Sequence, residues 1–203
     1  MIGGVDFVPW VIAGLFGFFL FRENMLRSLG AVAANKALFA YRQVKPVDSV
    51  FVRCFIEGTI RSFVFILFIL CAELIGINLF PDRPLESLVL WCSLWLLGAG
   101  FGLTFSALAV LVPETARIVR LTSLPLLIIS GVMFPIQYAP EVAQNYLLLN
   151  PIIHGLELLR EFFFDSYRTV NNISYIYLMA WIIGLNLLGL ILHIRFSQRL
   201  KIL

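Results

Sequence analysis

Long apolar runs constrain the fold of this sequence more than any other feature. Residues 50–80 and 175–194 are two such runs, with few charges inside them. About 20 apolar residues cross the hydrocarbon core of a bilayer as a helix, and lipid offers no partners for backbone groups left unpaired. The sequence therefore predicts transmembrane helices. Five candidate spans follow, over residues 7–21, 50–80, 88–112, 121–136 and 175–194.

The composition indicates the same class of protein. Hydrophobic residues make up 61% of the chain and charged residues 13%, with a mean hydropathy of +0.95, values far from those of a soluble domain. The net charge of +3 is too small and too dispersed for nucleic-acid binding. We therefore expect an all-α integral membrane protein with about five transmembrane helices, the fourth kinked or interrupted at Pro125 and Pro135.

Basic residues predict the orientation of the chain in the membrane. If the spans alternate in direction, eleven lysines and arginines fall on one side, in residues 22–53, between the third and fourth spans and in the C-terminal tail. The other side receives only Arg83, Arg160 and Arg168. The positive-inside rule then places the C-terminus in the cytoplasm.

The same alternation places Met1 outside the cell membrane. Nothing before Phe7 resembles a signal peptide, so an external start is unexpected. We expect that one upstream span is missing from this chain and that the complete subunit has six spans. A start that truly lies outside is the alternative.

Residues 135–172 are too polar for one span and too apolar for an ordinary exterior loop. Pro135, Pro140 and Pro151 remove backbone donors and disfavour helix just before them, so the segment should break into short helices there. Two arrangements stay open: re-entrant helices covered by protein or an aqueous cavity, and a helical hairpin lying on the lipid surface. Glu157 and Arg160 are three residues apart and should pair.

Glu57 and Arg61 are charged residues inside the second span. A lone charge at the centre of a membrane helix costs about 2.5 to 3.5 kcal/mol on insertion scales, and their spacing of four favours an ion pair. A functional pair and a purely structural clasp between helices are both open. In the third span, Gly98 and Gly102 form a small-residue pair that favours close helix packing.

Signatures of enzymes and metal sites are absent from the sequence. There is no phosphate-binding loop, HExxH or GxSxG motif and no clustered acidic pair. The three cysteines lack metal or redox spacing, and His154 and His193 lie on different predicted helices. We expect no catalytic residue, no metal site and no cofactor in this chain, so active transport would need energy from another subunit.

Two ordered groups of residues carry a resemblance to a known family. The first is NKALF at 35–39 followed by YRQVKP at 41–46, and the second is MFP at 133–135, LNP at 149–151, His154 and ELLRE at 157–161. They resemble the permease subunit of bacterial capsular polysaccharide ABC exporters, in the ABC-2 type transporter superfamily. The similarity covers nearly the whole chain. Residues 1–203 would form a single transmembrane domain without the family's N-terminal amphipathic helix and first span.

The resemblance implies a set of partners in the bacterial inner membrane. Such permeases are homodimers that work with two copies of a separate ATPase, which binds ATP and Mg, and with a periplasmic co-polymerase and an outer-membrane export protein. Residues 22–49 would form a cytoplasmic coupling loop on the ATPase; a mere positive-inside anchor is the alternative. The coupling residues would be Asn35, Lys36, Phe39, Tyr41, Arg42 and Lys45.

The resemblance also implies a lipid-linked anionic polysaccharide as cargo. Aromatic rings stack on sugars and arginine attracts acidic groups, so candidate path residues follow from chemistry and position. They are Glu57, Arg61, Tyr138, Tyr146, His154, Glu157 and Arg160. Residues 135–164 would line the exit of the path on the outer side, and reversing the charge of Arg160 should impair export without abolishing membrane insertion.

Other functions remain open from the sequence. Within transport, the cargo could be teichoic acid, O-antigen or a lipophilic drug. An intramembrane lipid-sugar transferase would need convergent acid, base or metal groups, and a non-catalytic membrane scaffold would need none. Copurification with an ATPase whose hydrolysis depends on this protein would separate a transporter from both.

Overall fold

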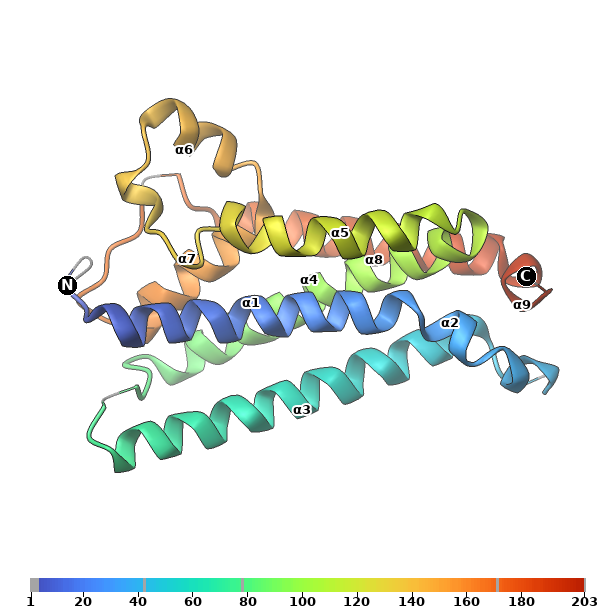
Figure 1. The fold of residues 1–203 in the computed structure, drawn as a ribbon, viewed down its shortest axis with the longest axis horizontal. Coiled ribbons are helices and arrows are strands. Elements are labelled where there is room, and N and C mark those ends of the chain that lie inside the picture. Colours follow the sequence, from blue (N-terminus) through green and yellow to red (C-terminus); the bar gives the residue numbers. More distant parts are fainter. Residues whose placement is uncertain (1–3, 42, 78, 171, 203) are drawn as a thin grey trace.

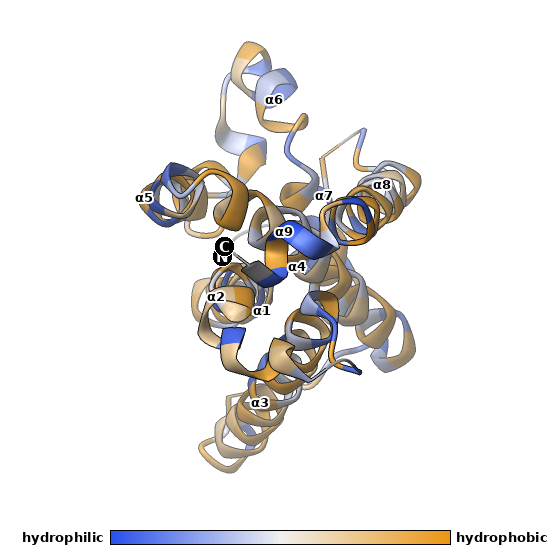
Figure 2. Ribbon diagram, turned by 90° about the vertical axis from the view of Figure 1, so that its right-hand side faces the viewer, coloured by the Kyte–Doolittle hydropathy of each residue, from blue (hydrophilic) through white to orange (hydrophobic). Residues whose placement is uncertain are grey.

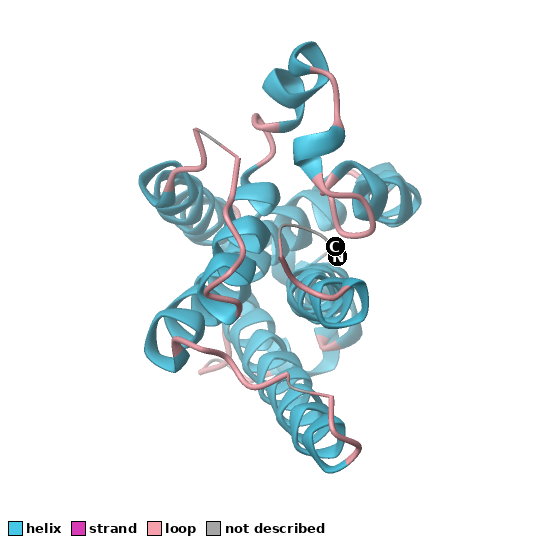
Figure 3. Cartoon of the chain, turned by 90° about the vertical axis from the view of Figure 1, so that its left-hand side faces the viewer, coloured by secondary structure: helices cyan, strands magenta, loops and turns pink. Residues whose placement is uncertain are grey.

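The computed structural model describes residues 4–41, 43–77, 79–170 and 172–202, which form helices joined by loops (Figure 3). Arg42, one of the expected coupling residues, lies outside them. The short 3-10 helices are η1 (Lys36–Ala40) and η2 (Ile136–Tyr138). The α-helices are α1 (Phe7–Leu29), α2 (Ala31–Ala34), α3 (Pro46–Leu74), α4 (Pro84–Leu111), α5 (Glu114–Ile129), α6 (Glu141–Leu147), α7 (Pro151–Phe163), α8 (Tyr175–Arg195) and α9 (Ser197–Ile202).

The all-helical fold expected from the sequence is confirmed, whereas the count of five spans is not. Among the described residues, α3, α4 and α8 are the helices long and apolar enough to cross a membrane. The helices α1 and α5 cover the other two expected spans and run alongside these three (Figure 1).

The limits of α1 and α5 differ from the expected spans. Residues 22–29 continue α1, because this stretch contains no Pro or Gly and the first glycine after it is Gly30. The connection between α1 and α3 is therefore shorter than the segment 22–49 that was expected to form a coupling loop. Pro125 lies inside α5 without ending it, and the helix stops at Ile129, with Gly131 in the left-handed region at φ 65°. The expected end of this span at residue 136 was wrong.

The two ends of the bundle differ in charge. The segment from α2 to η1, the junction of α4 with α5, and α9 lie at one end, which we call the basic end (Figure 1). Seen from that end, α9 is mostly hydrophilic (Figure 2). The link between α3 and α4 lies at the opposite end with α6, and we call this the far end. The basic residues therefore gather as the alternation of spans predicts.

The central helix is α4, which packs between α1 and α8. A Cβ added at Gly98 would lie 2.7 Å from the Phe21 carbonyl oxygen of α1, and one at Gly102 would lie 2.6 Å from the Ser28 Cβ. Both distances are shorter than real Cβ contacts, so the two helices touch because these positions have no side chain. Close packing through Gly98 and Gly102 is confirmed.

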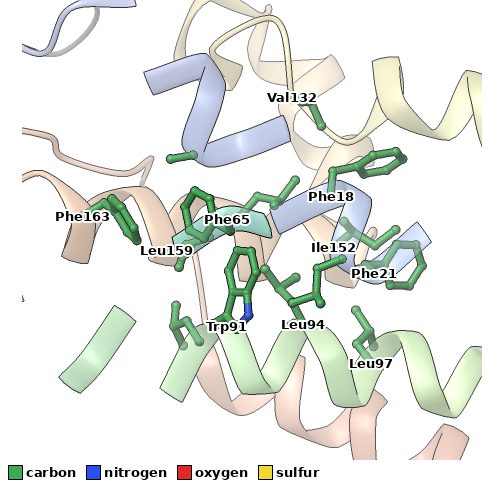
Figure 4. Packing of buried hydrophobic residues seen from close by; sticks show 14 of the residues in the cluster. Phe18, Phe21, Phe65, Trp91, Leu94, Leu97, Val132, Ile152, Leu159 and Phe163 are labelled. Carbon is green, nitrogen blue, oxygen red and sulfur yellow. The ribbon is translucent and has the colours of Figure 1, made fainter. Parts of the chain in front are cut away.

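The core forms where α1, α4 and α7 meet. Phe18, Phe21, Leu94, Leu97 and Ile152 lie in one buried apolar cluster (Figure 4). In the most apolar window of each long helix, 56% of α4 is buried but only 28% of α3 and 17% of α8. The outer faces of α3 and α8 thus present apolar side chains, which lipid or another protein must cover.

The segment between α5 and α8 breaks at its prolines, as expected. Pro135 precedes η2, Pro140 precedes α6 and Pro151 is the first residue of α7. No residue of α6 is buried, and this helix projects from the bundle (Figure 1). In contrast, most of α7 is buried against α1, α4 and α8. Protein covers α7, so its placement fits the re-entrant alternative better than a surface hairpin.

Candidate functional site

A buried ionic group, which we call the Arg160 clamp, lies on α7 near the far end. It consists of Glu157 and Arg160 with Trp10 of α1 and Tyr167 of the following loop. Arg160 Nη1 donates to Glu157 Oε1 at 2.9 Å, and the Tyr167 hydroxyl donates to Glu157 Oε2 at 2.8 Å. The guanidinium carbon lies 3.5 Å from the centre of the Trp10 ring. Burial, reinforced by the charge of Glu157, raises the pKa of Tyr167, so its hydroxyl stays protonated and can donate.

The Arg160 clamp also holds the chain that leaves α5. Arg160 Nη1 donates to the Gly131 carbonyl at 3.0 Å and Nη2 donates to the Val132 carbonyl at 2.8 Å. Gly14 of α1 leaves the space that the guanidinium fills, since a Cβ there would collide with it. One arginine therefore ties α7 to α1 and to the end of α5.

The predicted ion pair of Glu157 and Arg160 is confirmed, and protein encloses both side chains. The two side chains are 1% and 0% exposed, because Trp10, Tyr167 and the carbonyl groups after α5 enclose them. Neither reaches a polar path in this structure. A charge reversal at Arg160 would place two carboxylates face to face without water, so we expect it to destabilise the fold as well as impair export.

His154 is likewise enclosed rather than exposed. Its Nδ1 accepts from the Ser174 backbone N–H at 3.0 Å, and its Nε2 lies 2.8 Å from the Leu148 carbonyl. These partners require the neutral tautomer with hydrogen on Nε2. Since Ser174 caps α8 and Leu148 follows α6, the ring links three helices. His154 has no free nitrogen for cargo.

The surface of the far end carries the two predicted tyrosines. Tyr138 of η2 and Tyr146 of α6 are 70% and 72% exposed. At the same end of the bundle, Arg83 Nε donates to Asp165 Oδ1 at 2.9 Å, which fastens the end of α7 to the start of α4. Of the predicted path residues at this end, Tyr138 and Tyr146 are the ones open to contact.

A second charged group, which we call the arginine cluster, lies between α1 and α3 toward the basic end. Its members are Arg22, Glu23, Arg27, Arg53, Glu57 and Arg61. Glu57 Oε1 lies 3.0 Å from Arg53 Nη2. Arg61 Nη2 lies 3.5 Å from Glu23 Oε2 of the neighbouring helix. The predicted ion pair between Glu57 and Arg61 was therefore wrong, because each has a nearer partner.

The residues expected to contact the ATPase divide into buried and exposed ones. Phe39 is buried against the core at the basic end, and Asn35 Nδ2 donates to the Ala31 carbonyl at 2.8 Å. Lys36, Tyr41 and Lys45 are exposed. Two short helices, α2 and η1, lie within the segment that was expected to form a coupling loop. Of the described members of this predicted set, two cations and one aromatic ring are therefore exposed.

Residues 36–164 match the family described as ABC-2 type transporter. This segment contains α3, α4, α5 and α7 and both charged groups in part. The chain belongs to the ABC-2 type transporter family. Among the described residues, no three His, Cys, Asp or Glu side chains are placed to hold a metal ion.

Relatives within this family are similar over most of the chain. The polysialic acid transport protein KpsM of Escherichia coli is 33% identical over 189 residues, which cover 93% of this chain and 73% of the relative. The capsule polysaccharide export inner-membrane protein CtrC of Neisseria meningitidis is 28% identical over 97% of this chain and 74% of its own length. BexB of Haemophilus influenzae, with the same description, is 29% identical over 96% and 73%.

Sequence reasoning missed four members of the arginine cluster. Arg22, Glu23, Arg27 and Arg53 were assigned only to a basic loop or to helix ends. The spacing of four between Glu23 and Arg27, and between Arg53 and Glu57, was a usable signal of helical pairing. The contacts between α1 and α3 had no such signal, since they depend on how the two helices pack.

Proposed function

We propose that the protein is the transmembrane subunit of an ATP-driven exporter that moves lipid-linked capsular polysaccharide across the bacterial inner membrane. The observation that carries the proposal is similarity over more than nine-tenths of the chain to proteins of polysialic acid transport and capsule polysaccharide export. Membership of the ABC-2 type transporter family supports it. The names of these relatives favour capsular cargo over teichoic acid, O-antigen or a lipophilic drug.

The energy for export comes from a separate ATPase in this proposal. Two ATPase copies bind ATP and Mg and dock at the basic end, which faces the cytoplasm together with the C-terminus. Lys36, Tyr41 and Lys45 are exposed there, and cationic and aromatic side chains suit an acidic groove on a partner. Phe39 and Asn35 support the docking segment from inside.

The cargo path lies between two copies of the chain. A lipid-linked polyanion needs a lateral opening for its lipid and a wide polar route for its sugars, and a homodimer interface supplies both. Tyr138 and Tyr146 offer exposed rings for stacking on sugars at the far end. Glu57 and Arg61 belong to the charged lining near the basic end, while His154, Glu157 and Arg160 position the helices beside the path. A periplasmic co-polymerase and an outer-membrane protein continue the route.

Charge reversal at the basic end tests this proposal. We expect the amount of ATPase that copurifies with the Lys36→Glu, Lys45→Glu double variant to fall at least tenfold. Like charges across an interface cost several kcal/mol, and about 1.4 kcal/mol corresponds to a tenfold change in affinity. ATP hydrolysis that depends on the protein should fall with it. The measurement is ATPase recovered per mole of affinity-purified protein.

Two control variants sharpen this test. Lys36→Arg with Lys45→Arg keeps the charge and should retain the ATPase, and Arg168→Glu reverses an exposed charge of the far end and should have no effect. Unchanged ATPase recovery with the double reversal, at normal protein yield, would leave the basic end as a membrane anchor only.

A further inference from the structure

The arginine cluster holds more positive than negative charge. Its four arginines share two carboxylates, those of Glu23 and Glu57. Glu23 alone serves three arginines, with Arg22 at 2.7 Å and Arg27 and Arg61 each at 3.5 Å. Two positive charges of this group are therefore not balanced within it.

Hydrogen-bond donors in the same cluster are also unused. The Nε atoms of Arg22, Arg53 and Arg61 are buried and have no hydrogen-bond partner. Nearly all buried polar groups in proteins have at least one partner, and a guanidinium carries five N–H donors that match the oxygens of phosphate or carboxylate. The cluster thus lacks acceptors as well as negative charge.

The position of the cluster explains why the missing acceptor should belong to a lipid. At 1.5 Å per residue, Arg53 lies roughly 10 Å and Arg61 roughly 23 Å along α3 from Pro46, so the cluster extends from the basic end into the apolar part of the helix. Ile60 and Val64, on the neighbouring turns, are 50% and 42% exposed. An amphiphile can place an acidic group on the arginines and its acyl chain on these apolar side chains.

The side chains of the cluster are arranged with their cations outward. The side chains of Arg27, Arg53 and Arg61 are 54%, 40% and 34% exposed, whereas those of Glu23 and Glu57 are 15% and 9% exposed. A ligand arriving from outside the bundle therefore meets guanidinium groups, with the carboxylates behind them. An approaching anion therefore meets positive charge first.

We propose that the arginine cluster between α1 and α3 binds the phosphate group of a lipid. The lipid is either an anionic phospholipid of the bilayer or, if the proposed function holds, the lipid anchor of the cargo. Arginine suits this role because its planar fork binds two phosphate oxygens at once. Bound phosphate would supply the negative charge that the cluster lacks and would accept hydrogen bonds from the exposed edges of the guanidinium groups.

Lipid binding by the purified protein tests the proposal without the ATPase or the polysaccharide. Native mass spectrometry in detergent should detect roughly tenfold more phosphatidylglycerol than phosphatidylcholine bound to the protein, in keeping with one or two charge-assisted hydrogen bonds. The melting temperature of the unaltered protein should rise with phosphatidylglycerol and not with phosphatidylcholine. The second readout keeps the test valid even if a variant folds poorly.

Variants assign the binding to the cluster. Arg61→Gln should lose the preference for phosphatidylglycerol, Arg61→Lys should retain part of it because the charge but not the fork remains, and Arg83→Gln at the far end should retain all of it. Phosphorus analysis of protein purified from cells with and without capsule synthesis identifies the source. If the unaltered protein carries more phosphate than Arg61→Gln only when both are purified from capsule-producing cells, the site binds the cargo anchor.

The outcomes separate this proposal from the proposed function. A preference for phosphatidylglycerol supports a bilayer lipid, and capsule-dependent phosphate supports the cargo anchor. The absence of both, in a protein that still activates its ATPase, would overturn the lipid site and leave the exporter proposal intact. If Arg61→Gln loses its ATPase on copurification but binds phospholipid as before, the lipid site is also overturned. The cluster would then have a role in protein docking.

Discussion

Replacing Arg160 by glutamine should prevent most of the protein from accumulating in folded form. The change leaves the Glu157 carboxylate buried without its cation and frees the Gly131 and Val132 carbonyls. Removing one partner of a buried ion pair costs about 3 to 5 kcal/mol, a large part of the stability of an ordinary domain. The measurement is the yield of monodisperse protein in detergent, with the melting temperature of whatever remains.

Two further variants show whether the Arg160 clamp acts as a unit. The double variant Glu157→Gln, Arg160→Gln removes both charges and should cost less than the sum of the single changes. Arg83→Gln removes the cation of the exposed pair with Asp165 and should cost less than about 1 kcal/mol. Normal yield and melting temperature for Arg160→Gln would return this residue to the candidates for the cargo path.

Replacing Gly98 by alanine should separate α1 from α4 and destabilise the bundle by about 1 to 3 kcal/mol, the usual cost of overpacking. The new Cβ would lie 2.7 Å from the Phe21 carbonyl oxygen, and a backbone group cannot rotate away as a flexible side chain can. The helix propensity of alanine is about 1 kcal/mol better than that of glycine, and this gain offsets part of the overpacking cost.

Gly184 provides a matched control for Gly98. It lies in α8, and a Cβ there would have no atom within 4 Å. Gly184→Ala should therefore leave the melting temperature unchanged or raise it, by the propensity gain alone. Equal melting temperatures for the two alanine variants would show that the packing of α1 against α4 does not depend on the close contact at Gly98.

The long helices and one close contact between them were predictable because their signals are local. Apolar runs fixed α3, α4 and α8, and the spacing of Gly98 and Gly102 anticipated a helix contact. The spacing of Glu157 and Arg160 likewise anticipated their ion pair. The ends of α5 were harder to predict, since Pro125 is tolerated inside that helix while the left-handed turn at Gly131 ends it.

The surroundings of the charged side chains were not predictable from the sequence. His154 and Arg160 were candidates for the cargo path, but hydrogen bonds to backbone groups from other segments allow both to be buried. Glu57 was expected to pair with Arg61 on its own helix, yet Glu23 of α1 supplies a partner for Arg61. Contacts between distant segments decide these cases, and periodicity along one helix carries no information about them.

Transport of lipid-linked capsular polysaccharide into inverted membrane vesicles shows whether this protein and its ATPase form an exporter. Vesicles that contain the protein and its ATPase should take up radiolabelled polysaccharide when ATP is supplied, and vesicles that lack either subunit or receive a non-hydrolysable ATP analogue should not. We expect uptake that requires both subunits and ATP hydrolysis. Equal uptake by vesicles that contain the ATPase but lack this protein would contradict it.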